Sequence, residues 1–172
     1  MLLPIITYPD PSLKKIAIPI TEFDDSIRDL AESMLETMYV SNGVGLAAPQ
    51  VGRSTRLIVI DPDHYNSEKN PRVFINPEIE LIGENIVSEN EGCLSVPLNY
   101  RADIPRNNKI KVKYQNILGE IKEEIFEGFP AIIIQHEVDH LDGKLFIDKI
   151  SRLKRSLYES KVKKWIKNGG LE

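Results

Sequence analysis

The sequence predicts an α+β fold in which antiparallel β-sheets pack around a central helix, with one further helix near each end of the chain. Three observations predict this class. Short runs of alternating apolar and polar residues crowd the middle of the chain. Segments with helical periodicity lie before and after those runs. No regular alternation of strands with helices, which a parallel sheet would require, connects the two kinds of segment.

The first helix is predicted over residues 24–42. An Asp-Asp-Ser cluster at its start is typical of a helix N-terminus, and apolar residues then recur at helical spacing until Asn42-Gly43 ends the pattern. The glycine-rich segment 43–50 is predicted to be a helix cap followed by a turn. The apolar run at residues 57–60 is predicted to be a strand.

Further β-strands are expected in the middle of the chain, because short apolar runs there are separated by turn residues. These runs cover residues 73–75, 79–82, 109–114 and 120–126. A buried helix is predicted next, over residues 130–141, with Pro130 in its first turn and Gly143 just beyond its end. It is the central helix of the predicted fold.

The final segment, residues 149–168, is predicted to be an amphipathic helix with a basic outer face. It carries a net charge of +7, which leaves −11 on the rest of a chain whose overall charge is −4. The negative overall charge argues against a general nucleic-acid binder, such as a DNA-binding protein, whereas the asymmetry indicates an acidic partner for the helix. Its expected apolar stripe consists of Ile150, Leu153, Leu157, Val162, Trp165 and Ile166.

Length and composition limit the remaining possibilities. A chain of 172 residues is expected to form a single domain over residues 1–172. No apolar run approaches the roughly 18–20 residues that a membrane span needs, and the start does not have the pattern of a signal peptide. Cys93 is the only cysteine, so no internal disulfide can form. These features favour a cytoplasmic protein without membrane contact.

A metal-binding pattern lies in the predicted central helix, at His136-Glu137-Val138-Asp139-His140. Residues four positions apart share one helix face, so both imidazoles can reach one cation while Glu137 points at an open metal position. Cys93, within Glu91-Gly92-Cys93-Leu94-Ser95, is the favoured third ligand because a thiolate binds zinc and iron(II) well. Three protein ligands leave a fourth position open, which is typical of a catalytic metal site.

Two alternatives stay open on the residues alone. A zinc endopeptidase would use Glu159 as its third ligand, although Glu159 lies inside the basic helix. A non-catalytic structural metal module would be closed by His64 together with Cys93, His136 and His140, although His64 lies in a polar loop and is expected to face solvent. A longer zinc-protease pattern is excluded, because Phe146 stands where its third histidine would be.

Three motifs, taken in order, resemble the peptide deformylase family: Gly43-Val44-Gly45-Leu46-Ala47-Ala48-Pro49-Gln50, Glu91-Gly92-Cys93-Leu94-Ser95 and Gln135-His136-Glu137-Val138-Asp139-His140. The likeness extends over the whole chain, and the final helix is similar to that of the bacterial subgroup with a C-terminal helix. The resemblance implies a metal-dependent hydrolase that removes the formyl group from N-formyl-methionyl nascent polypeptides and releases formate.

The resemblance also implies which residues form the site. The implied ligands of one divalent metal ion are Cys93, His136 and His140, with Fe(2+) as the native ion and Zn(2+), Ni(2+) or Co(2+) able to substitute. Glu137 is implied as the catalytic acid/base. The side-chain amide of Gln50 and the backbone N–H of Leu94 are implied as donors to the negative charge that develops on the formyl oxygen.

The resemblance implies binding surfaces as well. The methionine of the substrate needs an apolar pocket, and Gly45 would let the backbone lie close to the substrate. Candidates for lining that pocket are Val44, Phe129, Ile132 and Ile133. A family arginine that contacts the substrate backbone aligns with either Arg101 or Tyr100. The basic final helix is expected to dock on ribosomal RNA near the exit of the nascent chain.

Overall fold

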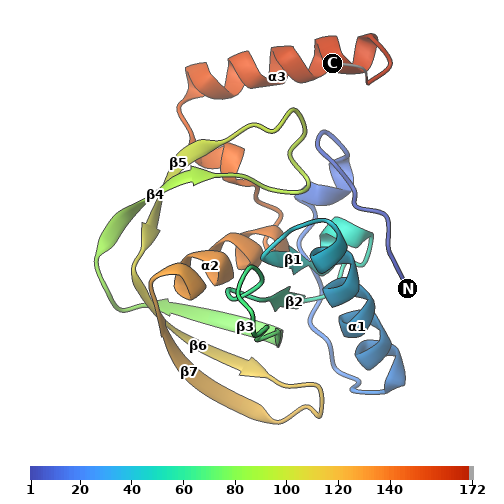
Figure 1. The fold of residues 1–172 in the computed structure, drawn as a ribbon, viewed down its shortest axis with the longest axis vertical. Helices are drawn as coiled ribbons and strands as arrows, with labels where there is room; N and C mark the ends of the chain where they lie inside the picture. The colour runs from blue at the N-terminus through green and yellow to red at the C-terminus, as the bar shows by residue number, and fades with distance from the viewer. Residues whose placement is uncertain (171–172) are drawn as a thin grey trace.

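The computed structural model describes residues 1–170 and confirms the predicted α+β class (Figure 1). The α-helices are α1 (Asp25–Val40), α2 (Phe129–Leu141) and α3 (Arg152–Lys167). The strands are β1 (Gly45–Ala47), β2 (Leu57–Ile60), β3 (Arg72–Leu81), β4 (Asn85–Glu91), β5 (Ala102–Asn107), β6 (Lys109–Gln115) and β7 (Ile121–Glu127). Short 3-10 helices are η1 (Pro11–Lys14), η2 (Ala48–Val51) and η3 (Phe146–Lys149).

The strands form two antiparallel sheets. One has five strands in the order β1-β2-β3-β6-β7, and the other consists of β4 and β5. The segments 73–75 and 79–82 were predicted as separate strands. This was wrong, because residues 73–75 and 79–81 belong to the single strand β3, which ends before residue 82. A bulge between Ile75 and Glu78 shifts the register of β3 against β6. Pro77 lies in this bulge and accounts for the interrupted sequence pattern, because proline cannot donate a ladder hydrogen bond.

The sequence does not predict the two-stranded sheet. Most residues of β4 are polar, and β5 contains Pro105, so neither strand has the clean alternation of a half-buried strand. Because the sheet has only two strands, each strand has an unpaired edge where a proline is tolerated. The sheet matters for the site, since Glu91 ends β4 only two residues before Cys93.

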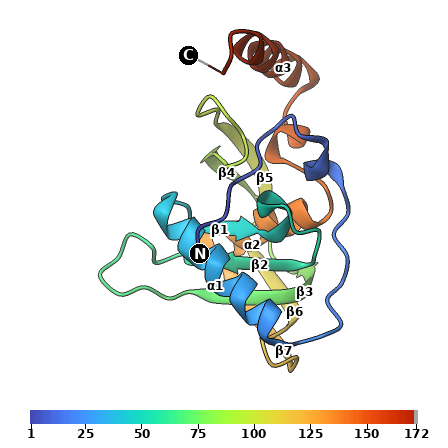
Figure 2. The ribbon, with the colours of Figure 1, turned by 90° about the vertical axis from the view of Figure 1, so that its right-hand side faces the viewer.

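Helices α1 and α2 cover opposite faces of the five-stranded sheet (Figures 1 and 2). The side chains of the fully buried strand β2 point alternately to the two faces and demonstrate this arrangement. Leu57 and Val59 pack in the same cluster as the methionines of α1, whereas Ile58 and Ile60 pack in the cluster that contains Ile134 of α2. Burying both faces of β2 explains why its sequence is apolar at every position.

Helix α3 contacts the rest of the protein through a different face from the predicted one. Leu153, Leu157 and Ile166 of the expected apolar stripe are 70%, 57% and 48% exposed, whereas Tyr158 and Val162 are buried. Tyr158 packs against Tyr8 and Tyr100, with ring centroids 5.8 and 4.4 Å away. The aromatic contact sets the rotation of the helix. The predicted stripe was therefore wrong for its three exposed residues, whereas its other members, Ile150, Val162 and Trp165, do pack against the core.

The N-terminal end of α3 also differs from the predicted boundary. Residues 146–149 form η3, and α3 begins after Ser151, whose side chain accepts a hydrogen bond from the N–H of Lys154.

None of the helices in the described part of the chain combines the length and the apolar content that a membrane crossing requires.

Candidate active site

Helix α2 carries both histidines of the sequence pattern into the interior. It starts after Gly128, whose φ of 69° suits glycine, and Pro130 lies in its first turn. His136 and His140 lie one turn apart on this buried helix, with their ring centroids 5.2 Å apart. The helical period therefore brings the two imidazoles to one side, as the spacing predicts.

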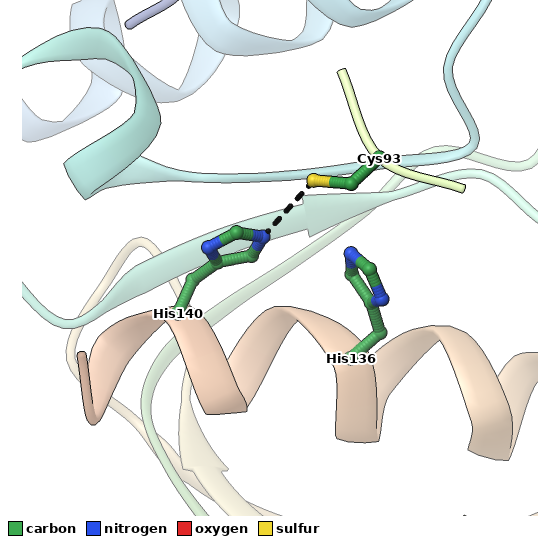
Figure 3. Close-up of side chains that lie close together, drawn as sticks. All are labelled: Cys93, His136 and His140. Atoms are coloured by element: carbon green, nitrogen blue, oxygen red, sulfur yellow. Dashed lines mark hydrogen bonds between the residues drawn. The ribbon is translucent and has the colours of Figure 1, made fainter. Parts of the chain in front are cut away.

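Cys93 faces the histidine pair from the loop that follows β4 (Figure 3). Its Sγ lies 3.3 Å from Nε2 of His140, and donor atoms of Cys93, His136 and His140 lie within 4.8 Å of one another. One sulfur and two imidazole nitrogens are a donor set suited to zinc or iron(II). These residues come from separate parts of the chain and could hold one divalent cation while leaving a coordination position open.

A row of charged side chains lies behind His136. Nδ1 of His136 is 2.9 Å from Oε1 of Glu91, and the guanidinium of Arg106 donates two hydrogen bonds to that carboxylate at 2.8 and 3.0 Å. Arg106 is only 5% exposed, and its Nη1 also donates to Asp139 at 2.7 Å. These four groups form a buried network between β4, β5 and α2.

The network keeps Glu91 ionised. Burial raises the pKa of this carboxyl, but hydrogen bonds from Arg106 and His136 outweigh burial and lower the pKa to about 2. A fixed carboxylate on Nδ1 sets the tautomer and orientation of the imidazole, so that Nε2 of His136 is available as a ligand atom. Burial lowers the pKa of His140, which favours the neutral, ligating form.

Glu137 lies in the same buried helix, with 3% of its surface exposed. Burial raises the pKa of its carboxyl to about 7. In the described part of the chain, its Oε1 atom has no hydrogen-bond partner. A carboxylate with a near-neutral pKa and a free oxygen is suited to accept and release a proton.

Gly45 has a role beyond the predicted one. A Cβ atom at this position would lie 2.5 Å from Oε2 of Glu137 and 2.9 Å from a methyl group of Ile133. The absence of a side chain therefore lets β1 pass directly against the Glu137 carboxylate.

Gln50 is held beside the sulfur of Cys93. It is 1% exposed, its Oε1 accepts a hydrogen bond from the N–H of Ala47, and its Nε2 donates to Ser95 Oγ at 3.0 Å and to Cys93 Sγ at 3.5 Å. Leu94 directly follows Cys93, and its N–H donates no hydrogen bond within residues 1–170. Both predicted oxyanion donors therefore lie next to the candidate ligand Cys93.

A cleft of about 490 Å³ opens in front of these groups. Its lining includes all five residues predicted for the substrate pocket, together with Cys93, His136 and Glu137. The five differ in exposure, because Ile133 is buried in the main core whereas Phe129 is 51% exposed at the rim. Val44 also packs against that core.

Arg101 and Tyr100, which alignment leaves as alternatives, have different surroundings although both line the cleft. The Tyr100 ring packs against the rings of Tyr158 and Phe146. Arg101 is exposed, and its Nη1 donates to the backbone oxygen of Asn90 at 3.3 Å. Only Arg101 therefore presents a charged group to the cleft.

The residues of the two alternative metal sites lie elsewhere. Glu159 accepts a hydrogen bond from Arg155 at 3.1 Å on α3 and does not join the Cys93, His136 and His140 group. His64 does not join it either. The expectation that His64 faces solvent was wrong, because it is buried, with Nδ1 2.6 Å from the backbone oxygen of Gly43.

The sequence analysis did not assign a role to Glu91, Arg106 or Asp139. A signal exists for the two acids, since they lie inside the motifs that supply the metal-binding pattern, and ligating histidines usually contact a carboxylate. Arg106 has no such local signal, because its position beside both acids results from the pairing of β4 with β5.

A buried helix that places two imidazoles and a carboxylate beside a thiol, at the wall of a cleft, is the arrangement of a metal-dependent hydrolase. Residues 2–156 match the family model described as polypeptide deformylase. The chain belongs to the polypeptide deformylase family and removes the N-formyl group from nascent peptides.

Relatives match this chain over nearly its full length. The peptide deformylase of Cellvibrio japonicus is 49% identical over 168 residues, which cover 98% of each chain. The crystal structure of a peptide deformylase from Legionella pneumophila has a TM-score of 0.89 at 41% identity and covers 100% of this chain and 99% of its own. A Met-Ala-Ser-bound class I type b peptide deformylase from Acinetobacter baumannii has a TM-score of 0.80 at 42% identity, covering 87% and 99%.

Proposed function

We propose that Cys93, His136 and His140 together hold the single divalent metal ion of this deformylase. The convergence of their donor atoms within 4.8 Å supports this assignment more than any other observation. We assign Fe(2+) as the native ion, with Zn(2+), Ni(2+) or Co(2+) able to replace it, because a thiolate with two imidazoles suits these borderline metals. When bound, the ion supplies Lewis-acid chemistry, which polarises an oxygen and makes water nucleophilic at neutral pH.

Glu137 acts as the catalytic acid/base. Its buried carboxylate takes the proton of the attacking water and delivers it to the peptide nitrogen, because an unprotonated amine leaves poorly. The pKa of about 7 suits both transfers near neutral pH. Proton transfer of this kind contributes about 10²–10⁴-fold to a rate.

Gln50 and Leu94 stabilise the negative charge that grows on the formyl oxygen. The Nε2 group of Gln50 lies 3.5 Å from Cys93 Sγ, so a formyl group beside the metal ligands lies within its reach. The N–H of Leu94, which donates no hydrogen bond within residues 1–170, is the second donor. Because both are fixed before the substrate arrives, each is worth about 3–4 kcal/mol of barrier.

The remaining cleft residues bind the peptide. Val44, Gly45, Phe129, Ile132 and Ile133 surround the methionine side chain. The guanidinium of Arg101 binds a backbone carbonyl of the substrate, since it is an exposed hydrogen-bond donor with a positive charge in the lining of the cleft. A relative that binds Met-Ala-Ser supports a site of about three residues. We also propose that residues 1–172 work as one catalytic domain.

The decisive experiment measures formate release from formyl-Met-Ala-Ser by anaerobically purified protein, with the metal content determined on the same sample. Glu137→Gln should retain the metal and lose about 10²–10⁴-fold in kcat. Cys93→Ser should lose metal, whereas Glu159→Gln, the matched control on α3, should keep both metal and activity. A Cys93→Ser protein with full metal content would contradict the ligand assignment.

We further propose that α3 docks on ribosomal RNA. Its outward surface combines exposed lysines with exposed Leu153 and Leu157, which the fold leaves uncovered. Phosphate contacts make such binding fall steeply with salt. A Lys161→Glu/Lys164→Glu variant should stop pelleting with ribosomes at low salt. The matched control reverses the charge of two exposed lysines on the sheet instead, and it should still pellet. Unchanged pelleting of the α3 variant would exclude docking through this helix.

A further inference from the structure

The loop between β2 and β3, residues 61–71, brings an exposed aromatic ring to the rim of the cleft. In Figure 2 this loop extends beyond the sheet, beside the C-terminal end of α1. Tyr65 is 71% exposed and lines the cleft together with Asn42 and Gly43. A single exposed apolar group is ordinary on a protein surface, so the inference depends on how this ring is held.

The Tyr65 ring is fixed on one face and at its hydroxyl. One face stacks on His64, with ring centroids 4.5 Å apart and planes 9° from parallel. The hydroxyl donates a hydrogen bond to the backbone oxygen of Asn42 at 2.6 Å. Since the residue nevertheless remains largely exposed, its opposite face is free to contact a ligand.

His64 is itself immobilised. Its Nδ1 lies 2.6 Å from the backbone oxygen of Gly43, and the ring of Tyr39 meets its ring at 86° with centroids 5.1 Å apart. The buried residue Asp61 anchors the base of the loop by accepting hydrogen bonds from the Tyr39 hydroxyl and from the N–H groups of Asp63 and Asn70. The ring of Tyr65 is therefore placed before any ligand arrives.

We propose that Tyr65 is a specificity-determining platform for a nascent-peptide side chain downstream of the formyl-methionine, and that it favours apolar and aromatic residues. The proposal rests on the assignment of the cleft as the peptide site. Glu137 and the Cys93, His136 and His140 group line the same cleft, so a peptide whose formyl end lies among them continues towards the rim. A pre-placed aromatic ring binds such a side chain at little entropic cost.

The test compares kcat/KM for three peptides: formyl-Met-Ala-Ser, formyl-Met-Phe-Ser and formyl-Met-Ala-Phe. Wild-type protein should use one of the phenylalanine peptides about three- to tenfold better than formyl-Met-Ala-Ser, as expected for an aromatic pair. Tyr65→Ser should bring that ratio close to one. Tyr65→Phe should keep most of the preference, because it retains the ring and the stacking on His64.

Leu118→Ser serves as the matched control, because it removes an equally exposed apolar side chain (67%) from the turn between β6 and β7, away from the cleft. It should leave the ratio unchanged. Two results would overturn the proposal: no preference for either phenylalanine peptide in the wild type, or an equal loss on all three peptides in Tyr65→Ser. Activity on formyl-Met-Ala-Ser tests the deformylase site separately, so the two failures are distinguishable.

Discussion

Replacing Gly45 by alanine tests whether the close approach of β1 to Glu137 matters for catalysis. The added Cβ would lie 2.5 Å from Oε2 of Glu137, and ordinary contacts begin at 3.4 Å, so the carboxylate must retreat by about 0.9 Å. Retreat is obstructed, because Glu137 is 3% exposed and Ile133, the second close neighbour, is 4% exposed. The substitution therefore moves the proposed acid/base or forces the core to rearrange.

A displacement of about 1 Å at a reacting group costs roughly 10²-fold in rate. We expect kcat for formyl-Met-Ala-Ser to fall by about that factor in Gly45→Ala, while the metal content stays at the wild-type level. Overpacking of a core costs about 1–3 kcal/mol, which corresponds to a melting temperature roughly 3–10 °C lower. Formate release, metal analysis and thermal unfolding on one preparation measure all three quantities.

Gly43→Ala is the matched control from the same segment. Its Cβ would meet the Leu94 side chain, at 2.8 Å from Cδ1, and a terminal methyl group can turn away at small cost. Its loss in kcat should stay below about fivefold, since no reacting group has to move. The reasoning is refuted if Gly45→Ala retains kcat within threefold of the wild type, because the Glu137 carboxylate would then tolerate the shift.

Two further predictions concern charge. Arg106→Met leaves the buried carboxylate of Glu91 without its cationic partner, so the free energy of unfolding in urea titrations should drop by about 3–5 kcal/mol. Metal affinity should weaken roughly 10–100-fold. Adding Glu91→Gln to this variant should recover part of the lost free energy of unfolding. No recovery would mean that the unpaired charge of Glu91 is not the cause. On the sheet, burial raises the pKa of Glu124, but hydrogen bonds from Arg72 and Tyr114 outweigh burial and lower it. Its stabilising contribution is therefore complete above the ordinary pKa of 4.5 and disappears as the pH falls through the lowered value. Glu124→Gln should flatten the acid decline of the unfolding free energy relative to the wild type, and identical pH profiles for the two proteins would contradict this.

Local patterns predicted most helices and several strands because their signals are contained within one segment. Helix α1 follows from its capping residues and helical periodicity, and the histidine pair follows from a four-residue spacing on α2. Strands β4 and β5 could not be found in this way, because most residues of β4 are polar and β5 contains Pro105, so neither has the alternation of a half-buried strand.

The same limit applies to the candidate site. The motifs indicate Cys93 and both histidines. They do not indicate that Arg106, on β5, donates hydrogen bonds to an acid on β4 and to another on α2. The rotation of α3 also depends on tertiary contacts, because Tyr158 finds an aromatic pocket that its own helix does not reveal. For Arg106 and Tyr158, contacts between elements decide the outcome, and no pattern within one segment reveals them.

The guanidinium of Arg106 joins β4 and α2 through carboxylates on both, and this has a consequence for how the protein acquires its ion. These ion pairs hold Glu91, next to the Cys93 loop, against the histidine-bearing helix without any contribution from a cation. Chelated protein should accordingly keep a full cooperative melt and take up a fresh ion without refolding. If so, we expect the ion found in purified protein to follow the metals supplied during growth, with the fold unchanged.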